Sequence, residues 1–337
     1  MEVNNEFLNG FISIADSMKR ERVERIERSK NTLSTGVRYL DLALGRIWPN
    51  DLIIVGAKTG AGKSELVTSI AATNVAQGKR VHFFALEAEQ DEIARRLKYR
   101  LIANKYWKSP DSSMERAGKT INYTDWYEGK LDRWLSKIEE EVEVEMGINF
   151  KNFYTFYRKS EDFGLNELKA QIIAAKNNTD LIIIDHLHYI DFEDSNENKA
   201  IADITKEIRG LALYGGKPII LVAHLRKTDR RHKTLIPDLD DFHGTSNIAK
   251  IATKAVLIGP CYDQMIRSTQ YATYMRVAKN RTDGTRCRYI AKCIWDVSKN
   301  AYEPKFELSN STFDDQTFEA LLANQMPDWT KEEINKG

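Results

Sequence analysis

The 337-residue chain is long enough for one large α/β domain with appendages, or for two small domains. Hydrophobic residues make up 42% and charged residues 29%, as in ordinary globular proteins, and no stretch approaches the roughly 18 consecutive apolar residues of a membrane helix. The net charge of +1 gives no support for a protein that coats nucleic acid. Because the three cysteines lack metal-ligand spacing and the N-terminus does not read as a signal peptide, we expect a cytoplasmic protein with no membrane partner.

Residues 1–30 are predicted to form a helix, because apolar residues recur near helical spacing and the charges between them alternate in sign. The apolar stripe consists of Phe7, Leu8, Phe11, Ile12, Met18, Val23 and Ile26. It must pack on its own domain or on a neighbouring subunit. The alternating charges favour an ion-paired surface over a nucleic-acid contact.

From residue 34 the pattern changes to apolar strands that alternate with helices. Strands are predicted at 51–56, 81–86, 153–157, 181–184, 218–223, 255–259, 274–278 and 288–296, and helices at 63–77, 91–104, 165–176 and 199–214. Continuous apolar strands between helices indicate a mainly parallel sheet that is covered on both faces. The predicted fold class is therefore α/β, with a domain over residues 31–308.

Two segments stand apart from this pattern. Residues 105–152 place tryptophans among charged residues, including the acidic run 139–145. Aromatic residues among charges can stack bases, but a small helical insertion that packs on itself is favoured. Residues 309–337 are polar and are interpreted as a C-terminal tail.

A phosphate-binding loop follows the strand at 51–56. It consists of Ala57, Lys58, Thr59, Gly60, Ala61, Gly62, Lys63 and Ser64, and fits the Walker A pattern except that Ala57 stands in place of the first glycine. Gly60 and Gly62 let backbone N–H groups turn toward phosphates, and the helix that begins at Lys63 adds its positive dipole end. Lys63 is expected to reach the β- and γ-phosphates, and Ser64 to ligate Mg²⁺. The loop therefore predicts a magnesium-dependent ATPase.

Acidic and basic residues at other strand ends complete this prediction. Asp185 ends a buried apolar strand, where a carboxylate is costly unless a charge such as the Mg²⁺ held by Ser64 meets it. Glu87 is a candidate to activate the attacking water, with Glu89 as its close competitor. His224 ends a further strand at the same edge and is a candidate sensor of the γ-phosphate.

Together these motifs resemble the hexameric, RecA-like replicative DNA helicases of the DnaB type, from about Thr32 to Pro304. The resemblance is carried by Thr35–Asp41, Phe84–Glu87, Leu181–Leu187, Val222–Lys227, Pro237–Leu239, Gly244–Ala249 and Ala278–Gly284. It implies that Glu87 rather than Glu89 is the catalytic carboxylate. It also implies that Lys279 and Arg281 act in trans, with Arg281 as a finger in the ATP site of the neighbouring subunit. His186 and His188 replace the Tyr and Gln of the family's Walker B segment.

The same resemblance implies a loop that lines a central channel and holds the DNA backbone. Its candidate residues are His243, Gly244, Thr245, Ser246, Asn247 and Lys250, with Lys199 in a second candidate loop. The loop departs from the family because it lacks the Arg-x-Ser-Gly pattern. No N-terminal collar or primase domain is recognised, and residues 1–30 correspond to the linker helix that family members dock on an adjacent subunit.

The expected function is an ATP- and Mg²⁺-dependent homo-hexameric motor that translocates on single-stranded DNA and unwinds duplex in replication. Its expected further partners are a primase or a helicase loader. Its expected location is the cytoplasm, that of a bacterial host if a phage or plasmid carries the gene. The alternative is a RecA-like ATPase without unwinding activity, such as a recombination mediator, a loader or a nucleotide-switched ring.

Overall fold

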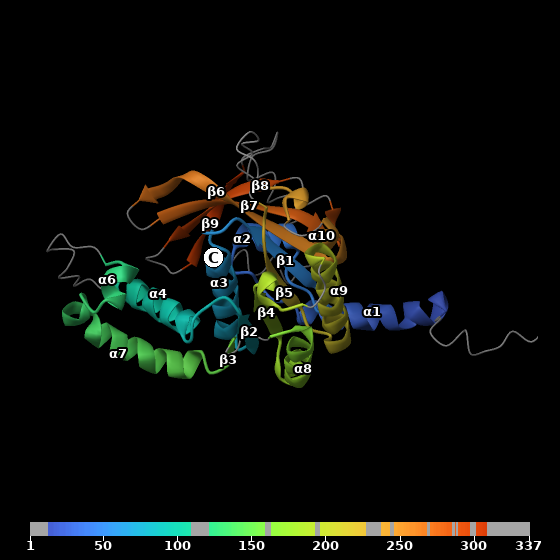
Figure 1. Cartoon of the computed structure of the whole chain (residues 1–337), viewed down its shortest axis with the longest axis horizontal. Coiled ribbons are helices and arrows are strands. Elements are labelled where there is room, and N and C mark those ends of the chain that lie inside the picture. Colours follow the sequence, from blue (N-terminus) through green and yellow to red (C-terminus); the bar gives the residue numbers. More distant parts are fainter. Residues whose placement is uncertain are drawn as a thin grey trace, which may run out of the picture.

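One twisted sheet with helices on both faces forms the body of the protein (Figure 1). The computed structural model describes residues 13–108, 121–158, 163–192, 196–226, 237–242, 246–267, 270–284, 287, 289–296 and 301–308. The strand order is β3-β2-β4-β5-β1-β6-β7-β8-β9. Strands β3 to β6 in this order run parallel, and β7, β8 and β9 are added antiparallel. The predicted α/β class with a mainly parallel sheet is confirmed.

The strands are β1 (Leu52–Ala57), β2 (Val81–Ala85), β3 (Phe153–Tyr157), β4 (Leu181–Asp185), β5 (Ile219–His224), β6 (Lys254–Arg267), β7 (Gln270–Asn280), β8 (Ile290–Asp296) and β9 (Ala301–Leu308). The helices are α1 (Ile14–Lys30), α2 (Arg38–Leu44), α3 (Lys63–Ala76), α4 (Glu92–Lys108), α6 (Tyr123–Tyr127), α7 (Asp132–Asn149), α8 (Leu165–Ala175), α9 (Glu197–Gly215) and α10 (Ser246–Ile251). Short 3₁₀ turns include η3 (Leu187–Tyr189) and η4 (Leu239–Asp241).

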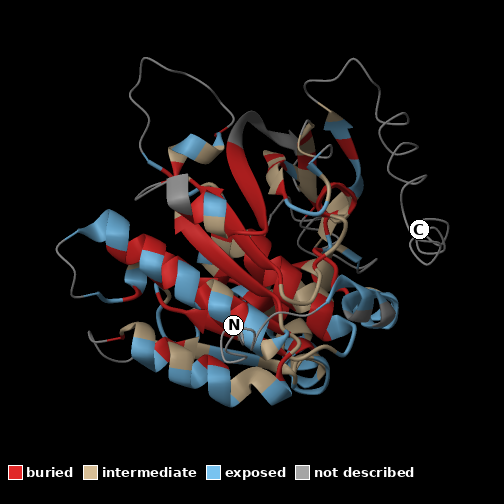
Figure 2. Ribbon diagram, turned by 90° about the vertical axis from the view of Figure 1, so that its right-hand side faces the viewer, coloured by how far each residue is buried: buried red, intermediate tan, exposed pale blue. Residues whose placement is uncertain are grey.

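The central strands are buried on both faces, as the red ribbons of Figure 2 show. Successive side chains of a strand point to opposite faces, so β1 contributes Ile53 and Val55 to one hydrophobic cluster, and Leu52 and Ile54 to the other. The first cluster lies against α2 and α3, and the second lies against α8, α9 and α10. This two-sided burial explains the continuous apolar runs in the sequence.

Strand β9 was not predicted from the sequence. It lies at the edge of the sheet beyond β8 and contains Pro304. Proline has no N–H to donate to a neighbouring strand and is tolerated mainly in edge strands. Its presence therefore weakens the strand pattern of this segment in the sequence. Only the pairing with β8 identifies it as a strand.

Two groups of helices lie at the margins of the sheet. Helices α4, α6 and α7 enclose a separate small core that includes Trp126, Leu135 and Val142. Helix α1 projects from the body, and its apolar residues Met18 and Val23 are exposed (Figure 1). Residues 1–12, 109–120 and 309–337 lie outside the described residues. The linker role of residues 1–30, the insertion at 105–152 and the tail at 309–337 stay predictions.

The Thr35–Asp41 motif has a structural role. The partly buried Asp41 carboxylate accepts hydrogen bonds from the Thr35 N–H at 2.6 Å, from the Thr35 hydroxyl at 2.8 Å and from the Ser34 hydroxyl. Gly36 has φ of 72°, and a Cβ there would clash with Thr73. The motif thus fixes the turn before α2 through a carboxylate and a glycine.

The buried Lys254–Asp51 pair gives a stability prediction. The Lys254 ammonium donates to Asp51 at 2.6 Å and to the Arg46 carbonyl at 2.8 Å, inside the core. We expect Lys254→Met to lower the free energy of unfolding by about 3–5 kcal/mol, because it leaves a buried carboxylate without its cation. Urea denaturation should measure this loss. The matched control Lys206→Ala breaks an exposed pair with Asp203 and should change stability by less than about 1 kcal/mol; equal losses in both variants would contradict the prediction.

Candidate nucleotide site

The phosphate-binding loop leaves the carboxyl end of β1 and leads directly into α3. Gly60 and Gly62 have φ of 78° and 88°, a left-handed conformation that glycine adopts without strain. Lys63 is buried, and its ammonium donates to the Lys58 carbonyl at 3.3 Å and lies 3.2 Å from Nδ1 of His224. The sequence-predicted loop therefore has the shape of a phosphate cradle, with Lys63 folded across it.

Asp185 ends β4 beside this loop and is only 5% exposed. Burial raises the pKa of its carboxyl to about 6, although the hydrogen bond from Ser64 and the charge of Lys63 oppose the shift. Among the described atoms its Oδ1 has no hydrogen-bond partner. An unsatisfied buried carboxylate oxygen beside a serine hydroxyl is a donor set that suits Mg²⁺, so Ser64 and Asp185 fit a magnesium ion.

The structure separates Glu87 from its competitor Glu89. The amides of Leu86 and Glu87 donate to the Asp185 carbonyl at 2.8 and 3.4 Å, which fixes Glu87 beside the end of β4. Its side chain is 44% exposed and reaches Nε2 of His186 at 3.1 Å. Glu89 points outward, is 84% exposed, and lies 3.8 Å from Arg95.

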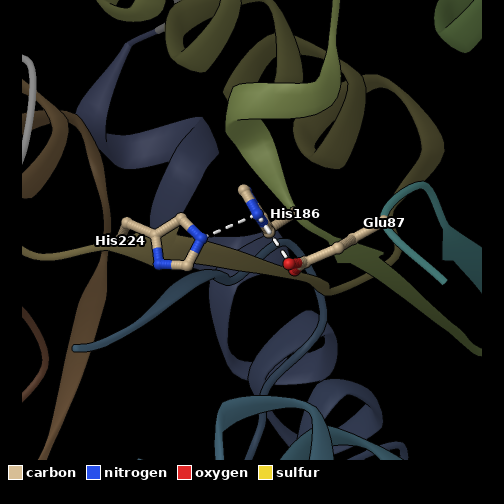
Figure 3. A group of neighbouring side chains, drawn as sticks. All are labelled: Glu87, His186 and His224. Atoms are coloured by element: carbon tan, nitrogen blue, oxygen red, sulfur yellow. Dashed lines mark hydrogen bonds and ion pairs between the residues drawn. The ribbon is translucent and has the colours of Figure 1, made fainter. Parts of the chain in front are cut away.

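Sequence reasoning missed the role of His186, which it treated only as a replacement within the Walker B segment. The ring is buried and lies between Glu87 and His224, with 2.8 Å separating the two Nε2 atoms of the histidines (Figure 3). Burial and the neighbouring His224, His188 and Lys63 lower its pKa to about 2, so the ring is neutral. The only signal in the sequence was a histidine directly after the strand-ending aspartate.

The phosphate-binding loop lies at the edge of the sheet formed by the carboxyl ends of the parallel strands. Lys279 and Arg281 lie at the opposite edge, formed by the amino ends of these strands. Lys254 of β6 pairs with Ile53 of β1 on one side and with Asn280 of β7 on the other. The end of β7 is therefore level with Ile53, which lies four residues along β1 from Ala57 at the start of the loop. This separation spans about 13 Å. Arg281 is exposed. Burial lowers the pKa of the nearby Arg209, and the charge of Arg281 adds to this shift; Arg209 also donates to the Asn50 carbonyl.

Local contacts hold this second edge in shape. Asn280 donates to the carbonyls of Ala43 and Leu44 at 3.0 and 3.2 Å, and its Oδ1 accepts from the amide of Thr282 at 3.1 Å. The Lys279 ammonium donates to the carbonyls of Ala249 and Lys250 at 2.6 and 2.8 Å, at the end of α10. Strand β7 is thereby joined to the helix that follows the candidate DNA loop.

The candidate DNA residues are only partly described. His243, Gly244 and Thr245 lie outside the described residues, and for Ser246 and Asn247 only the backbone at the start of α10 is described. Lys250 is exposed on α10, Lys199 is exposed in the first turn of α9, and these two helices pack against each other. In the part of the chain that the structure covers, no helix is long and apolar enough to cross a membrane.

Fold and site together define a RecA-like P-loop NTPase domain. The chain belongs to the family of the DnaB-like helicase C-terminal domain, which matches residues 32–291 and comprises ATP-hydrolysing DNA helicases. The predicted family resemblance is thus confirmed.

Individual relatives are distant. The chain is 27% identical over 234 residues to a "Probable plasmid replicative DNA helicase" of Chlamydia muridarum, covering 67% of this chain and 46% of that protein. It is 23% identical over 248 residues to the replicative DNA helicase DnaB of Mycoplasma genitalium, covering 71% of this chain and 48% of that protein. The chain thus spans about half the length of the curated relatives it matches.

Solved structures agree on the fold. One ATPase domain superposes with a TM-score of 0.66 at 15% identity, covering 87% of this chain and 99% of that one. A DnaB-like replicative helicase, whose structure is described together with its interactions with primase, superposes with a TM-score of 0.58 at 16% identity, covering 86% of this chain and 66% of that one.

The pKa of Asp185 leads to a prediction about stability. A carboxyl with a folded-state pKa near 6, against an ordinary value of 3.8, destabilises the fold once it is ionised. In magnesium-free buffer at pH 7.5 we expect Asp185→Asn to raise the free energy of unfolding by about 1–3 kcal/mol. The gain should shrink as pH falls through 6 and disappear near pH 4, where the wild-type carboxyl is protonated. Thermal unfolding at both pH values tests this; a gain of the same size at pH 4 would contradict it.

Proposed function

We propose that this chain is the motor of a hexameric, ATP-dependent DNA helicase that translocates on single-stranded DNA and unwinds duplex in replication. One observation carries the proposal: the catalytic groups are divided between two edges of the sheet. The loop with Lys63, together with Glu87, Asp185 and His224, lies at one edge, and Lys279 and Arg281 lie at the other. Such a division suits a site that two subunits complete together.

The first edge supplies the chemistry within one chain. The loop N–H groups and the start of α3 face the phosphates, and Lys63 neutralises the β- and γ-phosphate charge. Ser64 and Asp185 would hold Mg²⁺, which when bound offsets the negative charge of the phosphates. Glu87, which is partly exposed, accepts the proton of the attacking water. His224, whose ring lies beside the Lys63 ammonium, contacts the γ-phosphate.

The second edge supplies the neighbouring site. Arg281 follows the end of β7, and its backbone lies farther from the loop of its own chain than an arginine side chain can span. A guanidinium at this position therefore serves a phosphate held by a neighbour, and Lys279 accompanies it. Helix α1, whose apolar residues are exposed in the single chain, is proposed to dock on an adjacent subunit of the hexamer.

DNA is proposed to bind where α9 and α10 meet. Lys199 and Lys250 lie on these two helices, and the candidate residues 243–247 directly precede or begin α10 in the sequence. The hydrogen bonds of Lys279 join α10 to β7, the strand that leads to Arg281. DNA bound at α10 would thus be linked through Lys279 to the strand end at Arg281. The same proposal includes a primase or helicase loader as a partner and a cytoplasmic location.

Two assays test the proposal. The rate of ATP hydrolysis is measured with and without single-stranded DNA, and strand displacement is then followed on a forked duplex, between roughly 50 and 200 mM salt. A helicase motor should be stimulated by single-stranded DNA and should displace the strand only with ATP. Hydrolysis that is neither stimulated nor linked to unwinding at any salt would favour the RecA-like ATPase without unwinding activity.

A further inference from the structure

His186 lies between two groups that the proposed function uses. Its Nε2 is 3.1 Å from Oε2 of Glu87 and 2.8 Å from Nε2 of His224 (Figure 3). A single nitrogen of this ring therefore faces both the carboxylate and the second histidine. The ring itself is buried at the turn between β4 and η3.

The hydrogen bonds around the ring determine where its proton lies. The backbone N–H of His188 faces Nδ1 of His186 at 3.3 Å, so Nδ1 accepts and Nε2 carries the proton. The Nε2–H can then be shared between the Glu87 oxygen and Nε2 of His224. His224 accepts once its own proton is on Nδ1, with the Lys63 ammonium turned to the Lys58 carbonyl or to a nucleotide.

The same argument decides between a metal site and a hydrogen-bonded bridge. Ligand atoms of Glu87, His186 and His224 lie within 4.8 Å of one another, close enough to surround an ion. A metal would need the lone pair of Nε2 on His186, yet the His188 amide favours the ring form in which this atom is protonated. The trio therefore suits a donor shared by two acceptors.

We propose that His186 is a positioning residue that donates its Nε2–H to Glu87 and to His224, holding the catalytic carboxylate in register with the γ-phosphate contact. Glu87 extends from a loop and is half exposed, so without this donor its carboxylate samples many rotamers. The bridge restricts it to one orientation beside Asp185. This inference rests on the role proposed for Glu87.

Two substitutions at His186 separate donation from packing. His186→Phe keeps a ring but removes the N–H, and should lower the kcat for ATP roughly ten- to a hundredfold because the carboxylate is misplaced. The dissociation constant for ATP should stay within about twofold, because the phosphate cradle is untouched. His186→Gln restores an N–H donor and should recover most of the rate. His82→Phe, at a half-buried histidine that stacks on Tyr154 outside the site, is the control and should keep the wild-type rate.

A double-variant comparison shows whether His186 acts through Glu87. In single-turnover measurements His186→Phe should lower the rate far less in the Glu87→Gln background than in the wild type, because the contact with the carboxylate no longer matters and only the contact with His224 is lost. Three results would overturn the inference: a wild-type kcat in His186→Phe, a loss from His186→Phe that is as large in the Glu87→Gln background as in the wild type, or stoichiometric Zn²⁺ binding in calorimetry that His186→Phe abolishes. Full turnover by Glu87→Gln alone would instead refute the proposed function of Glu87.

Discussion

The Lys63→Ala protein is expected to lose ATP hydrolysis by at least about a hundredfold and to bind nucleotide weakly. In the proposed site Lys63 supplies the side-chain charge that meets the β- and γ-phosphates, while the loop glycines contribute backbone N–H groups and Ser64 a hydroxyl for Mg²⁺. Its ammonium is already held inside the site by the Lys58 carbonyl, so little ordering is needed when the nucleotide binds. Removing one such preorganised charge costs about 10²–10³ in rate.

Steady-state hydrolysis and nucleotide titration measure this effect. Lys206→Ala, which removes an exposed lysine of α9, serves as the control and should hydrolyse ATP like the wild type. Thermal unfolding of both variants shows whether the fold is intact. Hydrolysis at an unchanged rate in Lys63→Ala would refute the assignment of the phosphate-binding loop.

The Arg281→Ala protein is expected to assemble and to bind ATP, but to hydrolyse it about a thousandfold more slowly. Arg281 is exposed at the end of β7, so its removal disturbs no core contact. Its backbone amide still donates to the Thr253 carbonyl at 2.9 Å and Asn280 still shapes the turn, so the strand end keeps its form. The rate of ATP hydrolysis should therefore fall, whereas the nucleotide affinity and the oligomer mass should stay at their wild-type values.

Mixing two inactive variants tests whether the arginine acts on a neighbour. Lys63→Ala keeps Arg281 but lacks a working loop, and Arg281→Ala keeps the loop but lacks the finger. Mixed rings contain interfaces at which an intact loop meets an intact Arg281, so activity should reappear on mixing. If Arg281 served its own chain, no mixture would recover activity, and full activity of Arg281→Ala alone would refute the finger.

The cis half of the site was largely predictable because its signals are local. A glycine-rich loop between a strand and a helix needs only adjacent residues, and Asp185 is found by the apolar strand that precedes it. The choice between Glu87 and Glu89 could not be made from spacing alone, since both follow the same strand. The family resemblance favoured Glu87, and in the structure its carboxylate lies 3.1 Å from His186, while its catalytic role stays a prediction.

The remaining features depend on contacts between distant residues. His186 and His224 lie 38 positions apart and meet because β4 and β5 are neighbours in the sheet. Residues 301–308 form a strand only because they pair with β8. The position of Lys279 and Arg281, at the edge opposite the phosphate-binding loop, follows only from the register of β1, β6 and β7. No local propensity encodes these pairings.

The sequence by itself determined the phosphate-binding loop, the α/β class and the family. The signals are the residues of one loop, the alternation of strands with helices, and the order of short motifs along the chain. The tertiary structure alone decided which side chains share a site and which edge each one faces, because strand order and register are set by burial across the whole sheet. The register thus places Asn280, the residue before Arg281, four residue steps from the level of Ala57, and the proposal that Arg281 completes a neighbour's site rests on this separation.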